Sequence, residues 1–394
     1  MLIGVVGKPN VGKSTFFKAA TMQADVLIAN YPFATIKPNS GKGFVKIEDI
    51  AQKYGKISNP REGYVREGFR FVPINITDVA GIVPGASEGK GMGNQFLDDL
   101  STADVLIHVI DISGSTNDKG EPVELGSHDP LEDIKFLENE LNSWYFQIFN
   151  RGWQKFARQL QMSDKPLDKA IYEHFSGIKI TLQMVKDSIN DCKLHNNIVN
   201  WSEDQVKDFT KKLREKSKPI IIAANKSDLI SDDEFEKIKF ASNSVIIKMS
   251  ADFELALRMA DKQKIIDYIP GNNDFKILTE LNESQKAALN KIKNFIKENG
   301  GTGVQNILNY CVFKELNYIA VHPGGSTNLT DSKGNTLPDC FLMKYGSTAL
   351  DFAFRLHTDF GEKFIRAINC HNKKTVGKDY LLENLDIIEI VSDK

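Results

Sequence analysis

The sequence predicts an α/β fold: a doubly wound, mostly parallel sheet that carries a helical insertion and is followed by a small β-rich domain. Three observations lead to this prediction. Short apolar runs alternate with helical segments along most of the chain, as in repeated βα units. The first apolar run passes through a glycine-rich turn into a helix. From Asn317 onward, turn-rich stretches instead surround short strand candidates.

Composition limits the class of protein. The chain has 394 residues, enough for two or three domains, and a formal net charge of −2, so any contact with RNA must come from a local basic patch. No stretch approaches the roughly 20 apolar residues that span a bilayer. We therefore expect a soluble cytoplasmic protein without membrane contact, and we favour a monomer. The cysteines are scattered, without the spacing of a zinc site or a disulfide framework: Cys192, Cys311, Cys340 and Cys370.

The expected sheet begins with residues 2–6, an apolar run without polar alternation, as in a parallel strand covered on both faces. Helical segments separate several of the later strand candidates, which indicates βα repetition. These later candidates are residues 71–76, 105–111, 219–224 and 245–249.

A mostly helical segment interrupts this pattern. We expect an α/β domain over residues 1–127 and 218–316, with the insertion at 128–217 and the β-rich domain at 317–394. The latter contains one helix near 349–357. Apolar residues at three- and four-residue intervals predict an amphipathic helix early in the insertion: Leu131, Ile134, Leu137, Leu141, Trp144, Ile148 and Phe149.

Residues 7–14 read GKPNVGKS, which fits the phosphate-binding pattern G-x-x-x-x-G-K-[ST] between a strand and a helix. Backbone N–H groups of such a loop hold phosphate oxygens, and the helix adds the positive end of its dipole. Lys13 would reach the β and γ phosphates, and the Ser14 hydroxyl would bind Mg²⁺. The phosphate-binding candidates are Asn10, Val11, Gly12, Lys13, Ser14 and Thr15.

Two further motifs follow strand candidates. Asp78 opens a D-x-x-G segment, where the acid would hold Mg²⁺ through water and Gly81 would offer its N–H to the γ phosphate. The segment Asn225-Lys226-Ser227-Asp228 ends residues 219–224. The Asp228 carboxylate would accept from both N1–H and the 2-amino group of guanine, and a site built for these donors rejects adenine.

The remaining base contacts come from the same edge of the sheet. Asn225 would tie its loop to the phosphate loop, and the stem of Lys226 would cover the base. Ser250-Ala251 would give a backbone N–H to guanine O6. All four motifs occur in order at strand ends, where open α/β sheets bind ligands, and this predicts a guanine-nucleotide domain. A P-loop small-molecule kinase, the alternative enzyme class, would not need residues 225–228.

The chain resembles the Obg-like GTPases, and among them the YchF group of archaeal type. Residues 30–39 (NYPFATIKPN) are similar to that family's first switch, in which Thr35 would bind Mg²⁺ when GTP is present. Residues 81–94 are similar to its glycine-rich second switch. The C-terminal region resembles a TGS module, a β-grasp domain, on residues 344–348, 376–377 and 386–390. The resemblance implies a GTPase, and we expect slow intrinsic turnover with Mg²⁺ that a large partner or K⁺ accelerates.

The family resemblance and the base-reading residues of this sequence lead to different expectations for the nucleotide base. Many YchF proteins have an altered base-reading loop and prefer ATP, whereas Asn225, Lys226 and Asp228 match the guanine pattern here. We therefore expect GTP, with an ATP-preferring hydrolase as the alternative.

The residue that positions the attacking water is open at this stage. Ras-like switches use a glutamine after D-x-x-G, but Ile82 occupies that place. One option is K⁺ held partly by Asn10, which could equally stabilise its own turn. The other is a polar residue of the second switch, Ser87, Glu88 or Asn94. His108 is expected to be a hydrogen-bonded core residue.

The TGS resemblance implies a ribosome or another RNA-containing assembly as partner. A solvated charged face is the alternative role for the basic residues of this region. A scaffold with incidental turnover is a further alternative to a switch. The candidate phosphate contacts are Lys363, Arg366, Lys373, Lys374 and Lys378.

Overall fold

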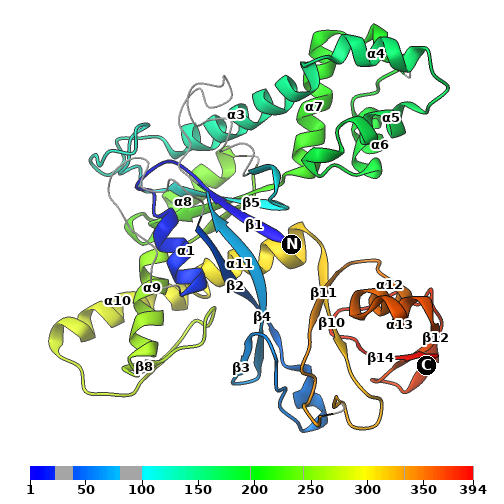
Figure 1. Ribbon diagram of the computed structural model, residues 1–394. Coiled ribbons are helices and arrows are strands. Elements are labelled where there is room, and N and C mark those ends of the chain that lie inside the picture. Colours follow the sequence, from blue (N-terminus) through cyan, green and yellow to red (C-terminus); the bar gives the residue numbers. More distant parts are fainter. Residues whose placement is uncertain (23–38, 80–99, 196, 243, 332, 394) are drawn as a thin grey trace.

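The computed structural model describes residues 1–22, 39–79, 100–195, 197–242, 244–331 and 333–393. Within them, seven strands form one mixed sheet with β2, β4, β1, β5, β6 and β7 in that spatial order and β3 paired to β4 (Figure 1). Five strands run parallel: β1 (Leu2–Val6), β4 (Phe69–Asp78), β5 (Val105–Asp111), β6 (Ile220–Asn225) and β7 (Ile246–Lys248).

An antiparallel extension completes this sheet. β2 (Asn39–Glu48) pairs with β4 over ten residues, and β3 (Tyr64–Arg66) pairs with the start of β4. The sequence prediction omitted both strands and assigned Asn39 to the first switch. The parallel strands confirm the predicted α/β fold, and β5 has the bounds that were expected.

Helices cover both faces of the sheet. On one face, α1 (Lys13–Thr21), α11 (Val304–Asn309) and the π-helical turn Tyr310–Glu315 pack against strand residues such as Val5 and Val109. On the other face, α3 (Pro130–Asn150) and α8 (Asp232–Ala241) pack against Leu106 and Ile222. Side chains of β5 alternate between these two cores, which explains its uninterrupted burial.

The insertion between β5 and β6 is helical. It comprises α3, α4 (Trp153–Gln161), α5 (Leu167–His174), α6 (Leu182–Asp191), α7 (Glu203–Ser217) and the short turns Ser176–Ile178 and Ile198–Asn200. Figure 1 shows that α3 and α7 lead away from the sheet to α4, α5 and α6 at the far end. Aromatic rings fill the interior there, with the centroids of Phe149 and Phe175 stacked 3.8 Å apart. Five of the seven residues of the stripe predicted for α3 are buried, and the other two, Leu131 and Ile148, are half-buried.

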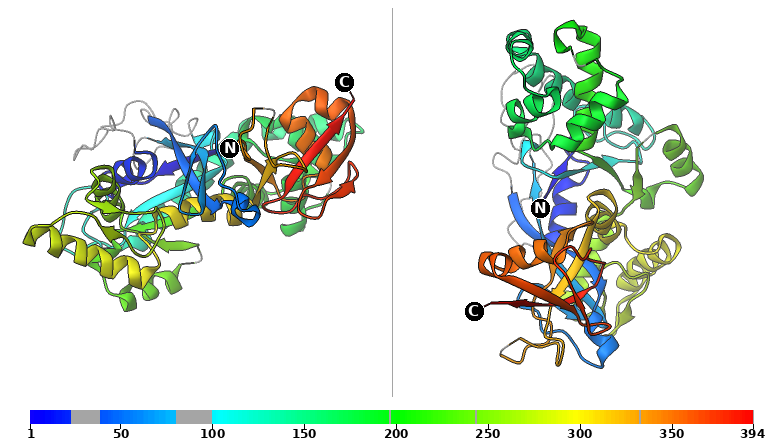
Figure 2. Two further views of the ribbon diagram at one scale, coloured as in Figure 1. Left: turned by 90° about the horizontal axis from the view of Figure 1, so that it is seen from below. Right: turned by 90° about the vertical axis from the view of Figure 1, so that its right-hand side faces the viewer.

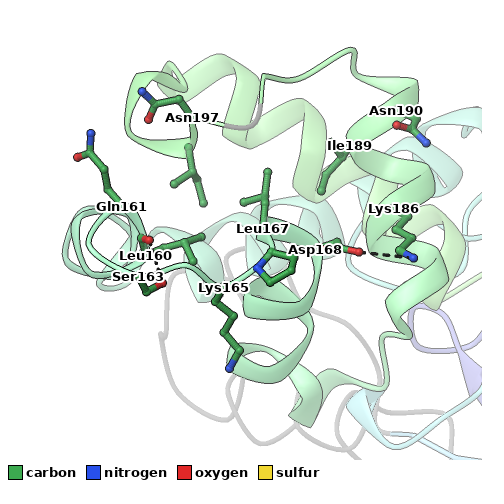
Figure 3. A pocket seen from close by; sticks show the side chains of 12 residues that line it. Leu160, Gln161, Ser163, Lys165, Leu167, Asp168, Lys186, Ile189, Asn190 and Asn197 are labelled. Atoms are coloured by element: carbon green, nitrogen blue, oxygen red, sulfur yellow. Dashed lines mark hydrogen bonds and ion pairs between the residues drawn. The ribbon is translucent and has the colours of Figure 1, made fainter.

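A hollow of about 760 Å³ lies among α4, α5 and α6, distant from α1 and the loop that precedes it (Figures 1 and 3). Its lining includes Leu160, Leu167 and Ile189, with an ion pair of 3.6 Å between Asp168 and Lys186 at one end. No buried polar atom without a partner lies among its lining residues, so we assign it no ligand.

A small subdomain follows β7. α9 (Ala251–Lys262) and α10 (Glu283–Asn299) enclose an apolar cluster together with the two-stranded sheet of β8 (Ile266–Asp267) and β9 (Lys276–Ile277). None of the described helices has the length and apolar character that a membrane span requires.

The C-terminal domain is a five-stranded sheet covered by helices α12 (Ala349–Leu356) and α13 (Thr358–Glu362). Its strands lie in the order β11, β10, β14, β12, β13, and β10 and β14 form its one parallel pair within the described residues. Their bounds are β10 (Tyr318–Pro323), β11 (Phe341–Lys344), β12 (Phe364–Asn369), β13 (Lys374–Val376) and β14 (Ile387–Ser392).

Arg61 and Arg70 hold this domain against the main sheet, beside which it lies in Figure 2, through contacts with the loop before β11. Arg70 of β4 is 1% exposed and donates hydrogen bonds to the carbonyls of Leu337 and Pro338. Burial lowers the pKa of its guanidinium. Arg61 forms exposed ion pairs with Asp331 at 2.7 Å and Asp339 at 2.8 Å.

Candidate nucleotide-binding site

The loop between β1 and α1 has the backbone of a phosphate-binding loop. Gly7, Asn10 and Gly12 all have positive φ angles, of 146°, 61° and 98°. A Cβ at Gly7 would lie 2.3 Å from the Val109 carbonyl oxygen, and one at Gly12 would lie 2.1 Å from Asn225 Nδ2. Glycine is therefore required at both ends, where the chain turns against β5 and β6.

Lys13 is the first residue of α1, and its side chain folds back over this loop. Its Nζ donates to the carbonyl of Lys8 at 2.8 Å. Burial lowers the pKa of the Lys13 ammonium to about 8, although the Asp78 carboxylate opposes the shift. The cation is thus held close to the loop in a poorly solvated place, where a phosphate would stabilise its charged form.

Asp78, at the end of β4, contacts Ser14, the residue of the phosphate loop that was expected to bind Mg²⁺. Ser14 Oγ donates to Asp78 Oδ2 at 3.3 Å. Asp78 is fully buried, its Oδ1 has no partner among the described residues, and burial raises its pKa against the opposing effects of Lys13 and Ser14. A hydroxyl beside a buried carboxylate with an unpaired oxygen suits Mg²⁺ and its bound water.

Asn225 joins three parts of the site. Its Nδ2 donates to the Val11 carbonyl of the phosphate loop at 2.8 Å, and its Oδ1 accepts from the Ala251 N–H at 2.9 Å. The side chain is 2% exposed, and β6 ends at this residue. One buried amide therefore fixes the phosphate loop relative to the start of α9.

Asp228 lies in the short turn Ser227–Leu229 that follows β6, with its carboxylate at the same edge of the sheet. Ser250 Oγ donates to its Oδ1 at 2.9 Å. Lys291 Nζ approaches its Oδ2 at 3.4 Å. The Lys291 side chain is 59% exposed, whereas that of Asp228 is 14% exposed. The Lys291 ammonium thus covers one oxygen of the Asp228 carboxylate, and because Lys291 is exposed, a ligand can displace it.

In this structure the N–H groups of Ser250 and Ala251 both have protein acceptors, and the expected contact to guanine O6 stays a prediction. The Ser250 N–H donates to the Thr302 carbonyl at 2.9 Å, and the Ala251 N–H donates to Asn225. Ser250 instead supports Asp228 through its hydroxyl. The next amides, of Asp252 and Phe253, belong to the first turn of α9 and have no intrahelical acceptor, so they are the available donors there.

Sequence reasoning missed Asp111, the last residue of β5. Burial alone would raise the pKa of its carboxyl, but hydrogen bonds led by that from Lys226 outweigh burial and lower it. Lys226 Nζ lies 2.7 Å from Asp111 Oδ2. The ammonium is therefore anchored in the sheet, which leaves only the stem of Lys226 to face a base. An acid at a strand end, followed by Ser113, Ser115 and Thr116, was the available signal.

The surroundings of Asn10 and His108 include features that the sequence did not predict. Asn10 Nδ2 donates to the Gly120 carbonyl at 2.8 Å, so this side chain connects the phosphate loop to a neighbouring loop. His108 is buried, but its Nδ1 has no partner among the described residues, and burial lowers its pKa to about 3. The expectation of a fully hydrogen-bonded His108 is therefore not met there.

The remaining expected residues fall into three groups. Thr15 is buried in α1. Thr35, Gly81, Ile82, Ser87, Glu88 and Asn94 lie outside the described residues. The basic residues Lys363, Arg366, Lys373, Lys374 and Lys378 are all exposed on the C-terminal domain.

Three family models match consecutive parts of the chain. They are the 50S ribosome-binding GTPase model at residues 2–146, the Obg-like GTPase YGR210-like, G4 motif-containing domain at 223–324, and the TGS domain at 332–392. An uncharacterised GTP-binding protein of Methanocaldococcus jannaschii is 45% identical over 99% of both chains. The chain belongs to the Obg-like YchF family of GTPases. Its C-terminal domain is a TGS domain, and both parts of the predicted resemblance are confirmed.

Other relatives extend this comparison. The crystal structure of a GTP-binding protein from Pyrococcus horikoshii matches with a TM-score of 0.80 at 38% identity and covers all of both chains. The ribosome-binding ATPase YchF of Bacillus subtilis is 30% identical over 92% of this chain and 87% of its own. This chain is accordingly a member of a family of P-loop nucleotide hydrolases, which generally use Mg²⁺. Some of its relatives are named as GTP-binding proteins and others as ATPases, so their names do not agree on the nucleotide.

Proposed function

We propose that the protein hydrolyses GTP to GDP and phosphate slowly and uses the reaction as a conformational switch. The observation that carries this proposal is the double hydrogen bond of Asn225 to Val11 and Ala251. It fixes the base-reading turn to the phosphate loop, so a nucleotide held at its phosphates would present its base to Asp228.

Guanine specificity would come from the Asp228 carboxylate. Guanine offers two donors, N1–H and the 2-amino group, which would displace the exposed Lys291 ammonium from this carboxylate, while Ser250 keeps the turn in place. Adenine offers neither donor and would leave a desolvated carboxylate unpaired, which is a large penalty.

The phosphate end would use residues of three segments. Lys13 would neutralise charge on the β and γ phosphates, and Mg²⁺, held by Ser14 and through water by Asp78, would polarise them. From the family resemblance we assign Thr35 a role at Mg²⁺ and Gly81 a role at the γ phosphate. Water attacks the γ phosphorus and GDP leaves. K⁺ beside Asn10 or a polar residue of the second switch would assist this attack.

Titration with GTP and with ATP in the presence of Mg²⁺ tests the base assignment, on the unchanged protein and on Asp228→Ala. The unchanged protein should prefer GTP by at least about a hundredfold. Asp228→Ala should lose this preference, mainly through weaker GTP binding. Asp233→Ala, an exposed acid in the first turn of α8, is the matched control and should keep it.

The alternative is an ATP-preferring hydrolase, which the name of the Bacillus subtilis relative supports. Tighter binding of ATP than of GTP, or equal binding of both, would establish it and overturn the guanine assignment.

We further propose that the GTP form associates with the ribosome. Support comes from the TGS domain, from its exposed basic residues and from the ribosome-binding name of the Bacillus subtilis relative. A nucleotide-dependent scaffold is the competing idea. Thr35→Ala distinguishes the two: a switch should lose GTP-dependent co-sedimentation with ribosomes, and a scaffold should retain it.

A further inference from the structure

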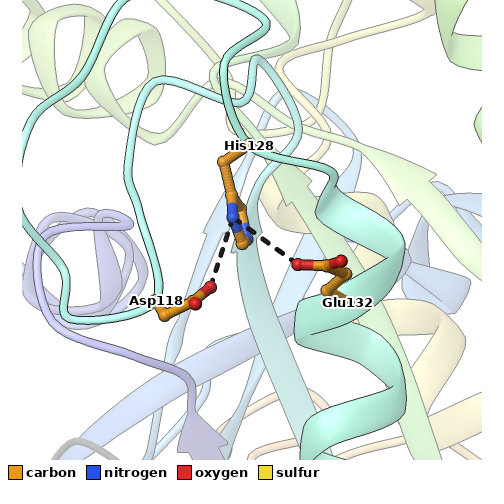
Figure 4. A group of neighbouring side chains, drawn as sticks. All are labelled: Asp118, His128 and Glu132. Atoms are coloured by element: carbon orange, nitrogen blue, oxygen red, sulfur yellow. Dashed lines mark ion pairs between the residues drawn. The ribbon is translucent and has the colours of Figure 1, made fainter.

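Three potential metal ligands face one another between the loop after β5 and the start of α3 (Figure 4). His128 Nδ1 lies 3.3 Å from Asp118 Oδ1 and 4.0 Å from Glu132 Oε2. All three ligand atoms lie within 4.8 Å of one another. Asp118 belongs to the loop, and Glu132 belongs to the first turn of α3. Figure 4 shows the carboxylates of Asp118 and Glu132 both directed at the same nitrogen of the His128 ring.

The other nitrogen of the ring determines how this group can act. His128 Nε2 lies 2.8 Å from Asp133 Oδ1. Asp133 is 7% exposed and its Oδ1 also accepts from Lys8 Nζ at 2.8 Å. Because a carboxylate can only accept, Nε2 carries a proton, which leaves Nδ1 as the ring nitrogen that faces the other two carboxylates. A metal ion among Nδ1 and these carboxylates would bind all three, and a histidine oriented by a carboxylate is the usual form of a metal ligand.

A cavity beside the cluster supplies an independent observation. About 260 Å³ of space is lined by Lys8, His108, Val109, Asp118, Glu132, Asp133 and Phe136. Two buried polar atoms of this lining, Asp133 Oδ2 and His108 Nδ1, have no partner among the described residues. Buried polar groups are normally satisfied, so these atoms indicate a missing ligand, such as water on a metal ion.

We propose that His128, Asp118 and Glu132 bind one Zn²⁺ ion, with Asp133 as the residue that orients His128. Zn²⁺ bonds of about 2.0–2.2 Å place neighbouring ligands roughly 3.4 Å apart in a tetrahedral site. The separation of 3.3 Å between His128 and Asp118 already matches this geometry. Glu132 is 65% exposed and can close the remaining gap. Three protein ligands leave the fourth position to water.

The donor set favours Zn²⁺ over the magnesium ion of the nucleotide site. Mg²⁺ and Ca²⁺ prefer oxygen ligands only, whereas imidazole nitrogen with carboxylates suits Zn²⁺. The scattered cysteines gave no indication of this site, because it uses none of them.

The site contacts the phosphate loop at two points. Lys8, in that loop, binds Asp133, and the Asn10 amide binds Gly120, two residues after Asp118. A Cβ at Gly120 would lie 2.9 Å from the Pro9 carbonyl oxygen, so the two loops are in direct contact. Zn²⁺ would thus bridge a loop that packs on the phosphate loop to the first turn of α3.

Calorimetric titration with Zn²⁺ tests the proposal on the full chain without a histidine tag. Excess Mg²⁺ keeps the nucleotide's own metal site occupied. One Zn²⁺ should bind per chain, and Asp118→Asn or Glu132→Gln should weaken binding at least tenfold. Glu124→Gln, an exposed acid of the same loop, removes the same charge without touching the cluster and should bind as the unchanged protein does.

Asp118 and Glu132 are exposed, so these variants should fold, and their circular dichroism melting curves would verify it. Co²⁺ provides a second readout, since its visible bands should change in His128→Gln. Absence of saturable Zn²⁺ binding would mean that a protonated His128 merely pairs with the acids. Unchanged affinity in both carboxylate variants, or tighter binding of Mg²⁺ or Ca²⁺ than of Zn²⁺, would also overturn the proposal.

Discussion

Ser14 of the phosphate loop donates its hydroxyl to Asp78 across 3.3 Å and so joins the start of α1 to the end of β4. The second carboxylate oxygen of Asp78 is buried without a partner among the described residues. The pair is arranged for a cation, because a buried carboxylate oxygen without a partner is costly to the folded state.

Asp78→Asn should therefore separate stability from activity. Folding raises the pKa of Asp78, so the folded state binds more protons than the unfolded state and loses stability as pH rises through the folded pKa. Asparagine removes this cost at neutral pH. We expect the free energy of unfolding to rise by about 1 kcal/mol, while GTP hydrolysis falls roughly a hundredfold.

Urea denaturation at neutral pH and a phosphate-release assay with varied Mg²⁺ measure the two effects. Ser14→Ala should lower hydrolysis without the gain in stability, since it keeps the buried charge. A loss of stability in Asp78→Asn would show that the carboxylate contributes to folding instead.

Lys13 should make nucleotide binding depend on pH. Its pKa is about 8 without phosphate because the ammonium is desolvated. A bound triphosphate favours the charged form, so binding above about pH 8 must take up a proton, and affinity should fall by up to about tenfold per pH unit. Fluorescence titration with a GTP analogue, kept below the pH at which guanine itself ionises, measures this slope.

Lys13→Met supplies the comparison for this pH dependence. It should bind GTP weakly and with no slope in this range. The unfolded state binds more protons than the folded state between about 8 and the usual lysine pKa, so the stability of the unchanged protein should rise with pH there. A slope that persisted in Lys13→Met would assign the proton to another group.

The residues of the site that sequence could predict are those whose roles follow from local order. The phosphate loop, β5 and the positions of Asp78, Asn225 and Asp228 at strand ends follow from short motifs and apolar runs. The acceptors of the Ser250 and Ala251 amides could not be predicted in this way. They are Thr302 and Asn225, which tertiary packing brings close to these amides.

The same reason applies to β2. Its buried positions, Gly43, Val45 and Ile47, alternate as a strand requires, but glycines and lysines dilute the pattern. Ten residues of pairing with β4 stabilise it, and that partner is distant in the sequence. Nor does any local signal show that Arg70 is buried against Leu337 and Pro338, more than 260 residues later.

Arg70→Met should loosen the attachment of the TGS domain. The guanidinium is buried and satisfies two carbonyls of the loop before β11, so its removal leaves these carbonyls unpaired. We expect a loss of about 2–4 kcal/mol in the stability of this interface, seen as earlier melting and faster proteolysis between the domains. Arg61→Met removes only exposed ion pairs and should cost less than about 1 kcal/mol. Equal effects of the two variants would show that the interface does not depend on Arg70.

The exposed lysines at the start of β13 and in the turn before it, Lys374 and Lys373, should contribute to ribosome association. Lys373→Glu with Lys374→Glu reverses two charges at the tip of the TGS domain, where side chains are exposed and the fold should tolerate the change. Each lost phosphate contact should lower the dependence of log affinity on log salt by about 0.7–0.9. Co-sedimentation with ribosomes at several salt concentrations measures both affinity and slope. Lys155→Glu with Arg158→Glu makes the same charge change on α4, and if it weakened binding equally, the effect would be one of overall charge rather than of this turn.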